Sequence, residues 1–159
     1  MPADAVLQSL VDRVAIEGVM VAYHRACDAP EGKGPLVAAL FTEDGRWESV
    51  GRFATPGWEA VGREALEAKF DRNHERMPYA LHHLTGGQVE VDGDAASGWW
   101  SYFQHCTHRG TTPLWIAGEY HVELRRQGAR WLIAQMLVEN HFTTPFDKGW
   151  VEVPHVATP

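Results

Sequence analysis

The sequence is short of several features that define large classes of proteins. It holds two cysteines, Cys27 and Cys106, which are too few for a disulfide framework and lack the close spacing of a zinc site. No stretch approaches the roughly 20 consecutive apolar residues of a membrane-spanning helix. Basic residues are outnumbered, with 14 Lys and Arg against 21 Asp and Glu and a net charge of -7. We therefore expect neither a nucleic acid nor a membrane as a partner.

Motifs for cofactor chemistry are also missing. The chain has no glycine-rich dinucleotide or phosphate loop, no GxSxG nucleophile turn and no HExxH metal motif. Its nine histidines are scattered, so metal ligands would have to converge from distant segments. The first residues carry Asp4 and no basic region, which is not the pattern of a secretory signal. We expect a cytoplasmic protein without metal or cofactor, which leaves acid–base chemistry by side chains.

What is present predicts a single domain over residues 1–159. The apolar fraction is 45% and the charged fraction 22%, as is typical of a soluble domain of this length. The sequence predicts helices over 5–29, 35–41 and 63–76, with a turn at 42–45 and a strand at 46–50 between the last two. Four longer strands follow, over 82–91, 95–108, 114–126 and 130–143. The order predicts an α+β fold, with three N-terminal helices packed on a curved, mostly antiparallel sheet.

A curved sheet around helices leaves a pocket at its concave face, a common place for a small molecule. Seven tryptophans are many for this length, and four fall in the predicted strands: Trp99, Trp100, Trp115 and Trp131. Such side chains form flat apolar walls, although core packing explains each of them equally well. The proline-containing segment 143–159 is expected to form an extended tail that could cover the pocket.

Two residues are the first candidates for acid–base chemistry. Asp28 lies in the last turn of the first predicted helix, where the helix dipole disfavours a carboxylate. It either faces solvent, pairs with His24 one turn earlier, or faces the pocket. His83 begins a predicted strand and, if the strand is regular, shares the apolar face with Val89.

The same alternation places the neighbouring histidine on the other face. We therefore expect His83 inside and His82 outside the sheet, although a bulge at Gly86 and Gly87 would reverse this assignment. A buried histidine is also compatible with a purely structural role.

Several short motifs, taken in order, resemble the SnoaL-like branch of the nuclear-transport-factor-2-like (NTF2-like) superfamily. The residues that carry them are Tyr23, Asp28, Phe41, Asp44, Gly45, Gly62, Arg63, Leu66, His83, Val89, Val91, Gly93, Asp94, Gly118, Tyr120, Gly128 and Trp131. The resemblance covers about residues 6–146, nearly the whole chain. It implies a cone-shaped α+β barrel, a fold that hosts enzymes and non-enzymes alike.

Within this superfamily the sequence is most similar to scytalone dehydratase, bile acid 7α-dehydratase and hexachlorocyclohexane dehydrochlorinase. Those enzymes use an aspartate at the end of the first helix and a histidine at the start of a strand as a catalytic pair. Asp28 and His83 fall at those positions, so the resemblance implies that they form the pair here.

Further residues are candidates for binding the substrate. The resemblance implies this role for Tyr23, His105 and Tyr120, and the aromatic content of the predicted strands adds Trp99 and Phe103.

The resemblance implies a cofactor-independent lyase, with dehydratase-like elimination on a small hydrophobic ring compound. Two alternatives stay open: an isomerase or polyketide cyclase that uses the same pair, and a non-catalytic binding or dimerisation module. Relatives and the need to cover sheet edges predict a homodimer or homotrimer.

Overall fold

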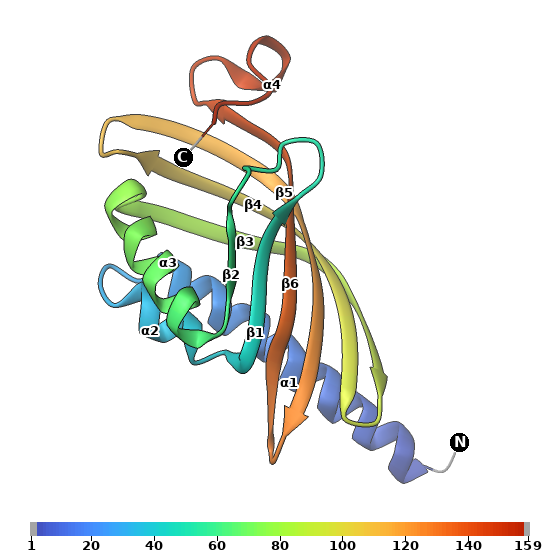
Figure 1. Cartoon of the computed structure of the whole chain (residues 1–159). Coiled ribbons are helices and arrows are strands. Elements are labelled where there is room, and N and C mark those ends of the chain that lie inside the picture. Colours follow the sequence, from blue (N-terminus) through green and yellow to red (C-terminus); the bar gives the residue numbers. More distant parts are fainter. Residues whose placement is uncertain (1–2, 158–159) are drawn as a thin grey trace.

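The computed structural model of the chain describes residues 3–157, which contain four helices and six strands (Figure 1). The helices are α1 (Ala3–Asp28), α2 (Lys33–Ala38), α3 (Arg63–Arg76) and α4 (Gly149–Glu152). The strands are β1 (Phe41–Val50), β2 (Glu59–Val61), β3 (Tyr79–Asp92), β4 (Ala95–His108), β5 (Thr112–Gln127) and β6 (Arg130–Pro145). No helix in this described part is long and apolar enough to cross a membrane.

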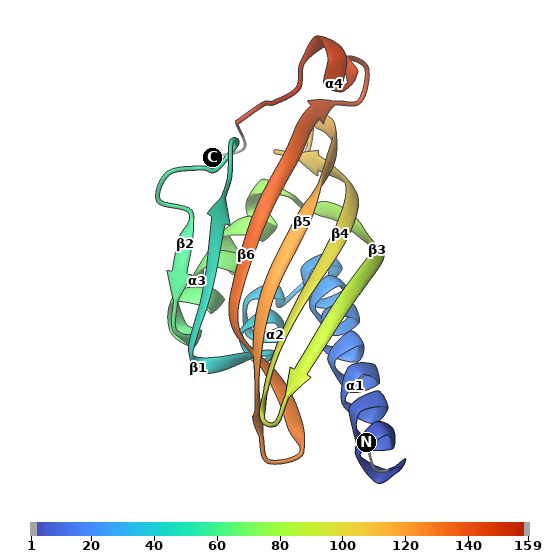
Figure 2. The same cartoon turned by 90° about the vertical axis from the view of Figure 1, so that its right-hand side faces the viewer.

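The strands form one curved, unclosed sheet in the order β2-β1-β6-β5-β4-β3. Neighbouring strands run antiparallel, except for β1 and β6, which are parallel. Helices α1, α2 and α3 gather on the concave side of this sheet (Figure 2). The predicted α+β architecture, with three N-terminal helices on a curved and mostly antiparallel sheet, is confirmed.

The structure differs from the prediction around the first strand. Residues 42–45 do not form a separate turn but belong to β1, which pairs irregularly with β6 between Phe41 and Arg46. The Gly45 carbonyl accepts the Gly62 N–H at 2.8 Å, which joins this irregular stretch to the entry of α3. Strand β2 and helix α4 are too short to have shown a periodic pattern in the sequence.

Helix α1 packs on the sheet mainly through its C-terminal half. Ile16, Met20 and Tyr23 follow the spacing of one helix face and are buried. In the N-terminal half the apolar side chains point to solvent instead, with Leu7 62% and Val14 72% exposed. The helical period was therefore readable in the sequence, but the face that the sheet covers was not.

An ion pair anchors the N-terminal half of α1 to the sheet. The buried carboxylate of Asp12 accepts two hydrogen bonds from the Arg126 guanidinium, at 2.9 and 2.8 Å. The Arg126 side chain lies over the Trp131 ring, 4.4 Å from its centroid. The pair thus connects α1 to the hairpin between β5 and β6.

One extra residue in β3 decides which side chains face the helices. Thr85 pairs with Ser101 and Gly87 with Trp100, so Gly86 has no partner in β4 and forms a bulge. Gly86 has a φ of 64°, in the left-handed region that suits glycine. Before the bulge the even-numbered Ala80 and His82 face the concave side, whereas after it the odd-numbered Val89 does.

Candidate active site

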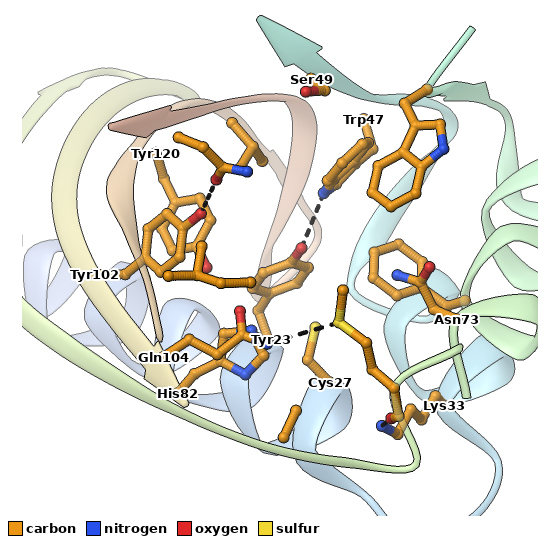
Figure 3. Close-up of a pocket in the computed structure, with 17 residues that line it drawn as sticks. Tyr23, Cys27, Lys33, Trp47, Ser49, Asn73, His82, Tyr102, Gln104 and Tyr120 are labelled. Atoms are coloured by element: carbon orange, nitrogen blue, oxygen red, sulfur yellow. Dashed lines mark hydrogen bonds between the residues drawn. The ribbon is translucent and has the colours of Figure 1, made fainter. Parts of the chain in front are cut away.

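A cavity of about 90 Å³ lies between the helices and the concave face of the sheet (Figure 3). Aromatic side chains form much of its wall: Tyr23, Trp47, Trp58, Phe70, Tyr102 and Tyr120. Other polar groups come from all sides: Lys33, Ser49, Asn73, His82, Gln104 and Asn140. Within residues 3–157 nothing after Asn140 lines the cavity, so the segment expected to cover it lies elsewhere. That segment returns alongside β6, where Val156 donates its N–H to the Thr143 carbonyl at 2.8 Å.

A carboxylate–imidazole pair lies at one wall of the cavity. Asp28 is the last residue of α1 and His82 lies near the start of β3. Asp28 Oδ1 is 2.5 Å from His82 Nδ1, and Asp28 Oδ2 accepts the backbone N–H of His82 at 3.0 Å. The side chains of His82 and Asp28 are 11% and 17% exposed. Two contacts with one residue therefore fix the carboxylate against the imidazole ring.

This arrangement determines the chemistry available to the ring. An ionised carboxylate only accepts hydrogen bonds, so the hydrogen on Nδ1 points at Asp28 and the neutral ring keeps a lone pair on Nε2. His82 lines the cavity and Asp28 does not, so the carboxylate lies behind the ring. The pair therefore offers a nitrogen that accepts a proton and a carboxylate that stabilises the resulting imidazolium.

The predicted orientation of the two neighbouring histidines is wrong. The sequence predicts His83 inside and His82 outside, and the structure shows the reverse. His83 is exposed and stacks on His105, with 5.5 Å between the ring centroids, so it does not contact Asp28. The reason is the bulge at Gly86, because an extra residue shifts the inward face of β3 by one position. The partner of Asp28 is therefore His82.

A second imidazole packs behind the pair. His24 lies one turn before Asp28 on α1, is 5% exposed, and has its ring centroid 5.1 Å from that of His82. Its Nε2 is buried and finds no hydrogen-bond partner among the described residues. Burial, followed by repulsion from His82, lowers the pKa of His24 to about 3, so this ring is neutral at physiological pH.

Three tyrosines line the cavity from different elements. Tyr23 accepts a hydrogen bond from Trp47 Nε1 at 2.9 Å, and Tyr102 donates to Asn140 Oδ1. Tyr120 stacks on Tyr102 with 4.4 Å between the ring centroids. Burial raises the pKa of all three hydroxyls, so each remains a protonated group.

Two of the five predicted substrate-binding residues lie at the cavity, namely Tyr23 and Tyr120. The other three, Trp99, Phe103 and His105, are odd-numbered residues of β4 and point to the opposite face. There Trp99 donates to Glu119 at 2.8 Å, Phe103 stacks on Trp115, and His105 bonds the Tyr79 hydroxyl at 3.0 Å.

The prediction for these three residues is wrong because β4 presents its even-numbered residues to the helices. Tyr102 and Gln104 line the cavity in their place. The structure sets this phase through the pairing of His82 with Gln104 across the strands, and it appears as the alternation of buried and less buried positions in β4.

The remaining chemistry-bearing side chains of the cavity are Lys33 and Cys27. Lys33 reaches inward from the start of α2 and donates to the Met77 carbonyl at 3.2 Å. Burial raises the pKa of the Cys27 thiol to about 12, so it is protonated and unreactive as a nucleophile. No group of three His, Cys, Asp or Glu side chains within residues 3–157 is placed to hold a metal ion.

The family model of the SnoaL-like domain matches residues 8–136. The chain belongs to the SnoaL-like family. The match includes most of α1, both members of the Asp28–His82 pair and most of the strands around the cavity. No protein of curated function matches this SnoaL-like sequence.

Solved structures with the same fold include proteins named for elimination reactions. One, from Novosphingobium aromaticivorans, has the provisional name scytalone dehydratase; it is 20% identical over 87% of this chain and 89% of its own, with a TM-score of 0.76. The hexachlorocyclohexane dehydrochlorinase LinA-type3 from Novosphingobium barchaimii is 19% identical over 96% and 99%, with a TM-score of 0.76.

A third solved structure is that of Rv3472, a protein of unknown function from Mycobacterium tuberculosis. It is 26% identical over 89% of this chain and 77% of its own, with a TM-score of 0.73. Another solved structure, from Novosphingobium aromaticivorans, is named an NTF2-like protein; it is 24% identical over 94% of this chain and 91% of its own, with a TM-score of 0.67, and shares the fold.

Proposed function

We propose that this protein is a cofactor-independent lyase that removes water from a small hydroxylated ring compound. The observation that carries this proposal is the Asp28–His82 pair, with 2.5 Å between Oδ1 and Nδ1, at the wall of an aromatic cavity. Membership of the SnoaL-like family and similarity to structures named dehydratase and dehydrochlorinase support the same class of reaction.

The reaction needs one base that also acts as an acid. His82 Nε2 takes a proton from a carbon next to an activating group, the C–H electron pair forms the C=C bond, and the C–O bond to the hydroxyl breaks. The imidazolium returns the proton to the leaving oxygen, so the products are an alkene and water and the ring is neutral again. Asp28 stabilises the charged intermediate form of the ring through Nδ1.

The shape of the cavity supports a flat substrate. Trp47, Phe70 and Tyr120 present ring faces and edges to the same space, which suits a planar or nearly planar ring. Asn73, Gln104 and Asn140 supply amide groups that can orient polar substituents.

The test is turnover of a panel of hydroxylated cyclic ketones, with mass spectrometry to detect loss of water. We expect His82→Ala to lower kcat/KM by about 10²–10⁴-fold, because it removes the general acid–base. Asp28→Asn should cause a similar loss, because the amide can turn its NH₂ toward Nδ1 and favour the wrong tautomer. His83→Ala is the matched control and should keep wild-type turnover, since His83 faces away from the cavity.

The outcomes separate the three functional classes. A product of unchanged mass, lost in His82→Ala, would replace the lyase with an isomerase or cyclase. Wild-type turnover in His82→Ala would exclude His82 as the acid–base and assign catalysis to another group. Ligand binding without turnover in the wild type would make the protein a binding module.

A further inference from the structure

The cavity contains a buried ammonium group without an acidic partner. Lys33 is 3% exposed and lines the cavity. Its Nζ donates to the Met77 carbonyl at 3.2 Å, and no carboxylate within residues 3–157 forms an ion pair with it. An ammonium group carries three N–H donors, so one carbonyl leaves most of its hydrogen-bonding capacity unused.

The other lysines of the chain have contacts that Lys33 lacks, although burial also lowers the pKa of Lys69, to about 8. Lys69 is also buried, but its Nζ lies between two indole rings, 4.2 Å from the centroid of Trp47 and 4.4 Å from that of Trp58. Lys148 is exposed and pairs with Glu152 at 3.0 Å. Lys33 has neither kind of partner, although a buried charge is costly unless it is paired.

The position of Lys33 relates this charge to the proposed base. In Figure 3 Lys33 and Asn73 lie on one side of the cavity, and His82 and Gln104 lie on the other. A ring compound in the space between them would present one edge to His82 and the other to Lys33. Removal of a proton by His82 leaves negative charge on the substrate, and a cation on the opposite wall stabilises that charge.

We propose that Lys33 anchors an anionic oxygen of the substrate, so that the cavity selects small ring compounds bearing a carboxylate, a phenolate or a group that becomes an enolate. This assignment rests on the proposed function, because it names the substrate class of the same site. Lys33 fixes the oxygen and places the carbon to be deprotonated before His82. Asp28 acts on Lys33 only at a distance, so the direct anionic contact that the Nζ lacks among residues 3–157 comes from the ligand.

The charge of the whole protein makes this selectivity testable. With a net charge of -7 the molecule repels anions in general, so a preference for an anion must come from a local cation. The side chains that line the cavity include no aspartate and no glutamate. Apart from Lys33, the one lining group able to carry positive charge is the His82 ring.

The experiment compares binding of 4-fluorobenzoate and 4-fluorobenzamide by ¹⁹F NMR titration. The two probes have nearly the same shape and differ in charge. We expect the wild type to bind the benzoate about 10-fold more tightly, the difference between a charge-assisted and a neutral hydrogen bond. Lys33→Met should remove this preference, whereas Lys148→Met, the matched control at the surface, should keep it.

Two further variants keep the result decisive. His82→Gln should lose elimination activity but still bind benzoate more tightly than benzamide. This variant therefore tests the anion anchor separately from turnover. Lys33→Gln replaces Lys33→Met if the latter does not fold. Equal affinity for the two probes in the wild type, or an unchanged preference in the folded Lys33 variant, would overturn the anchor without affecting the acid–base pair.

Discussion

His24 is a titratable residue in a buried environment. Its ring is buried against His82 and Tyr120, and burial lowers its pKa to about 3, from an ordinary value of 6.5. In the unfolded chain the ring takes up a proton below pH 6.5, whereas in the folded protein it stays neutral down to about pH 3. Because the unfolded state binds more protons in this window, His24 makes folding less favourable as the pH falls.

This leads to a prediction for stability between pH 6 and pH 4. The free energy of unfolding should fall as the pH falls, with His24 contributing up to about 1.4 kcal/mol per pH unit. His24→Phe keeps an aromatic ring in the site and should flatten the profile measured by urea unfolding. The exposed control His121→Gln should leave the slope unchanged.

Other titrating groups do not mimic this effect. The hydrogen bond from Arg126 lowers the pKa of Asp12, so the stability that Asp12 adds is lost only below its ordinary value of 3.8. Burial also lowers the pKa values of His108 and His155. Both histidines are present in the wild type and in His24→Phe, so their contribution cancels when the two pH profiles are compared. Identical slopes for these two proteins would contradict the prediction.

At the scale of single residues the sequence predicted the carboxylate and missed its partner by one position. Asp28 follows from the end of a helix whose period is readable over many residues. The histidine depends on the phase of a strand, and a single bulged residue inverts that phase. The Gly86-Gly87 pair showed that a bulge was possible, but whether it forms depends on the pairing with β4. Lys33 escaped notice because nothing local distinguishes a buried lysine from an exposed one.

At the scale of elements, the β3–β4 pair is shaped by the ring of Trp100. This side chain is 1% exposed and its Nε1 donates to Glu17 on α1 at 3.1 Å. A Cβ at Gly87 would lie 2.2 Å from Trp100 Cδ1, and a Cβ at Gly98 would lie 2.2 Å from Cη2. Two glycines thus make room for one indole, which holds α1 against the sheet.

The two neighbouring glycines of β3 should therefore respond differently to substitution. Gly86→Ala meets no atom within 4 Å, so its cost is the strain of a left-handed residue, about 1 kcal/mol. Gly87→Ala drives a methyl group into a buried indole and should cost about 3 kcal/mol. Thermal unfolding should show a loss in Tm of about 3 °C for the first and about 9 °C for the second.

The outcome also tests how β3 is built. An equal loss in both variants would mean that the Trp100 ring moves aside freely. A larger loss for Gly86→Ala would mean that the conformation of the bulge, rather than the packing around Trp100, limits the stability of this strand pair.

Sequence patterns predicted the ranges of long helices and strands well, but they predicted poorly which face of each element is buried. The α3 range of 63–76 and the β4 range of 95–108 were predicted to the residue, because turn and breaker residues bound both elements. The phase of β4 was not, so Trp99, Phe103 and His105 were assigned to the cavity although they face outward. A strand with large side chains on both faces carries little information about which face is covered.

At the scale of the whole molecule, α1 exposes an apolar stripe that begins in its N-terminal half and reaches Val21. The exposed fractions are 62% for Leu7, 54% for Leu10, 72% for Val14 and 50% for Val21. These residues share one helix face together with Gly18, at which an added Cβ would meet no atom within 4 Å. The stripe is a surface on which a second helix can lie closely.

We predict that α1 of a second copy, in antiparallel orientation, covers this stripe. Centred on Val14, such a pairing places Leu7 of each copy opposite Val21 of the other, and large Leu10 opposite small Gly18. It also brings Asp4, near the start of the helix, close to Arg25 near its end, so opposite charges meet at both ends of the contact. On the basis of this self-complementarity we predict a homodimer rather than a homotrimer.

We therefore expect sedimentation equilibrium to give a mass of twice the 17.8 kDa chain. The double variant Leu10→Glu, Val14→Glu should sediment as a single chain, because it places four carboxylates in the two-fold contact while disturbing no buried neighbour. Val151→Glu, at a position that is 92% exposed on α4, is the control and should remain dimeric.

A single-chain mass for the wild type would show that the stripe is unpaired in solution. A trimer, or a dimer that survives both glutamates, would place the contact elsewhere. The half-buried Trp115 on the convex face and the exposed Phe146 beside it would then become the surface to mutate.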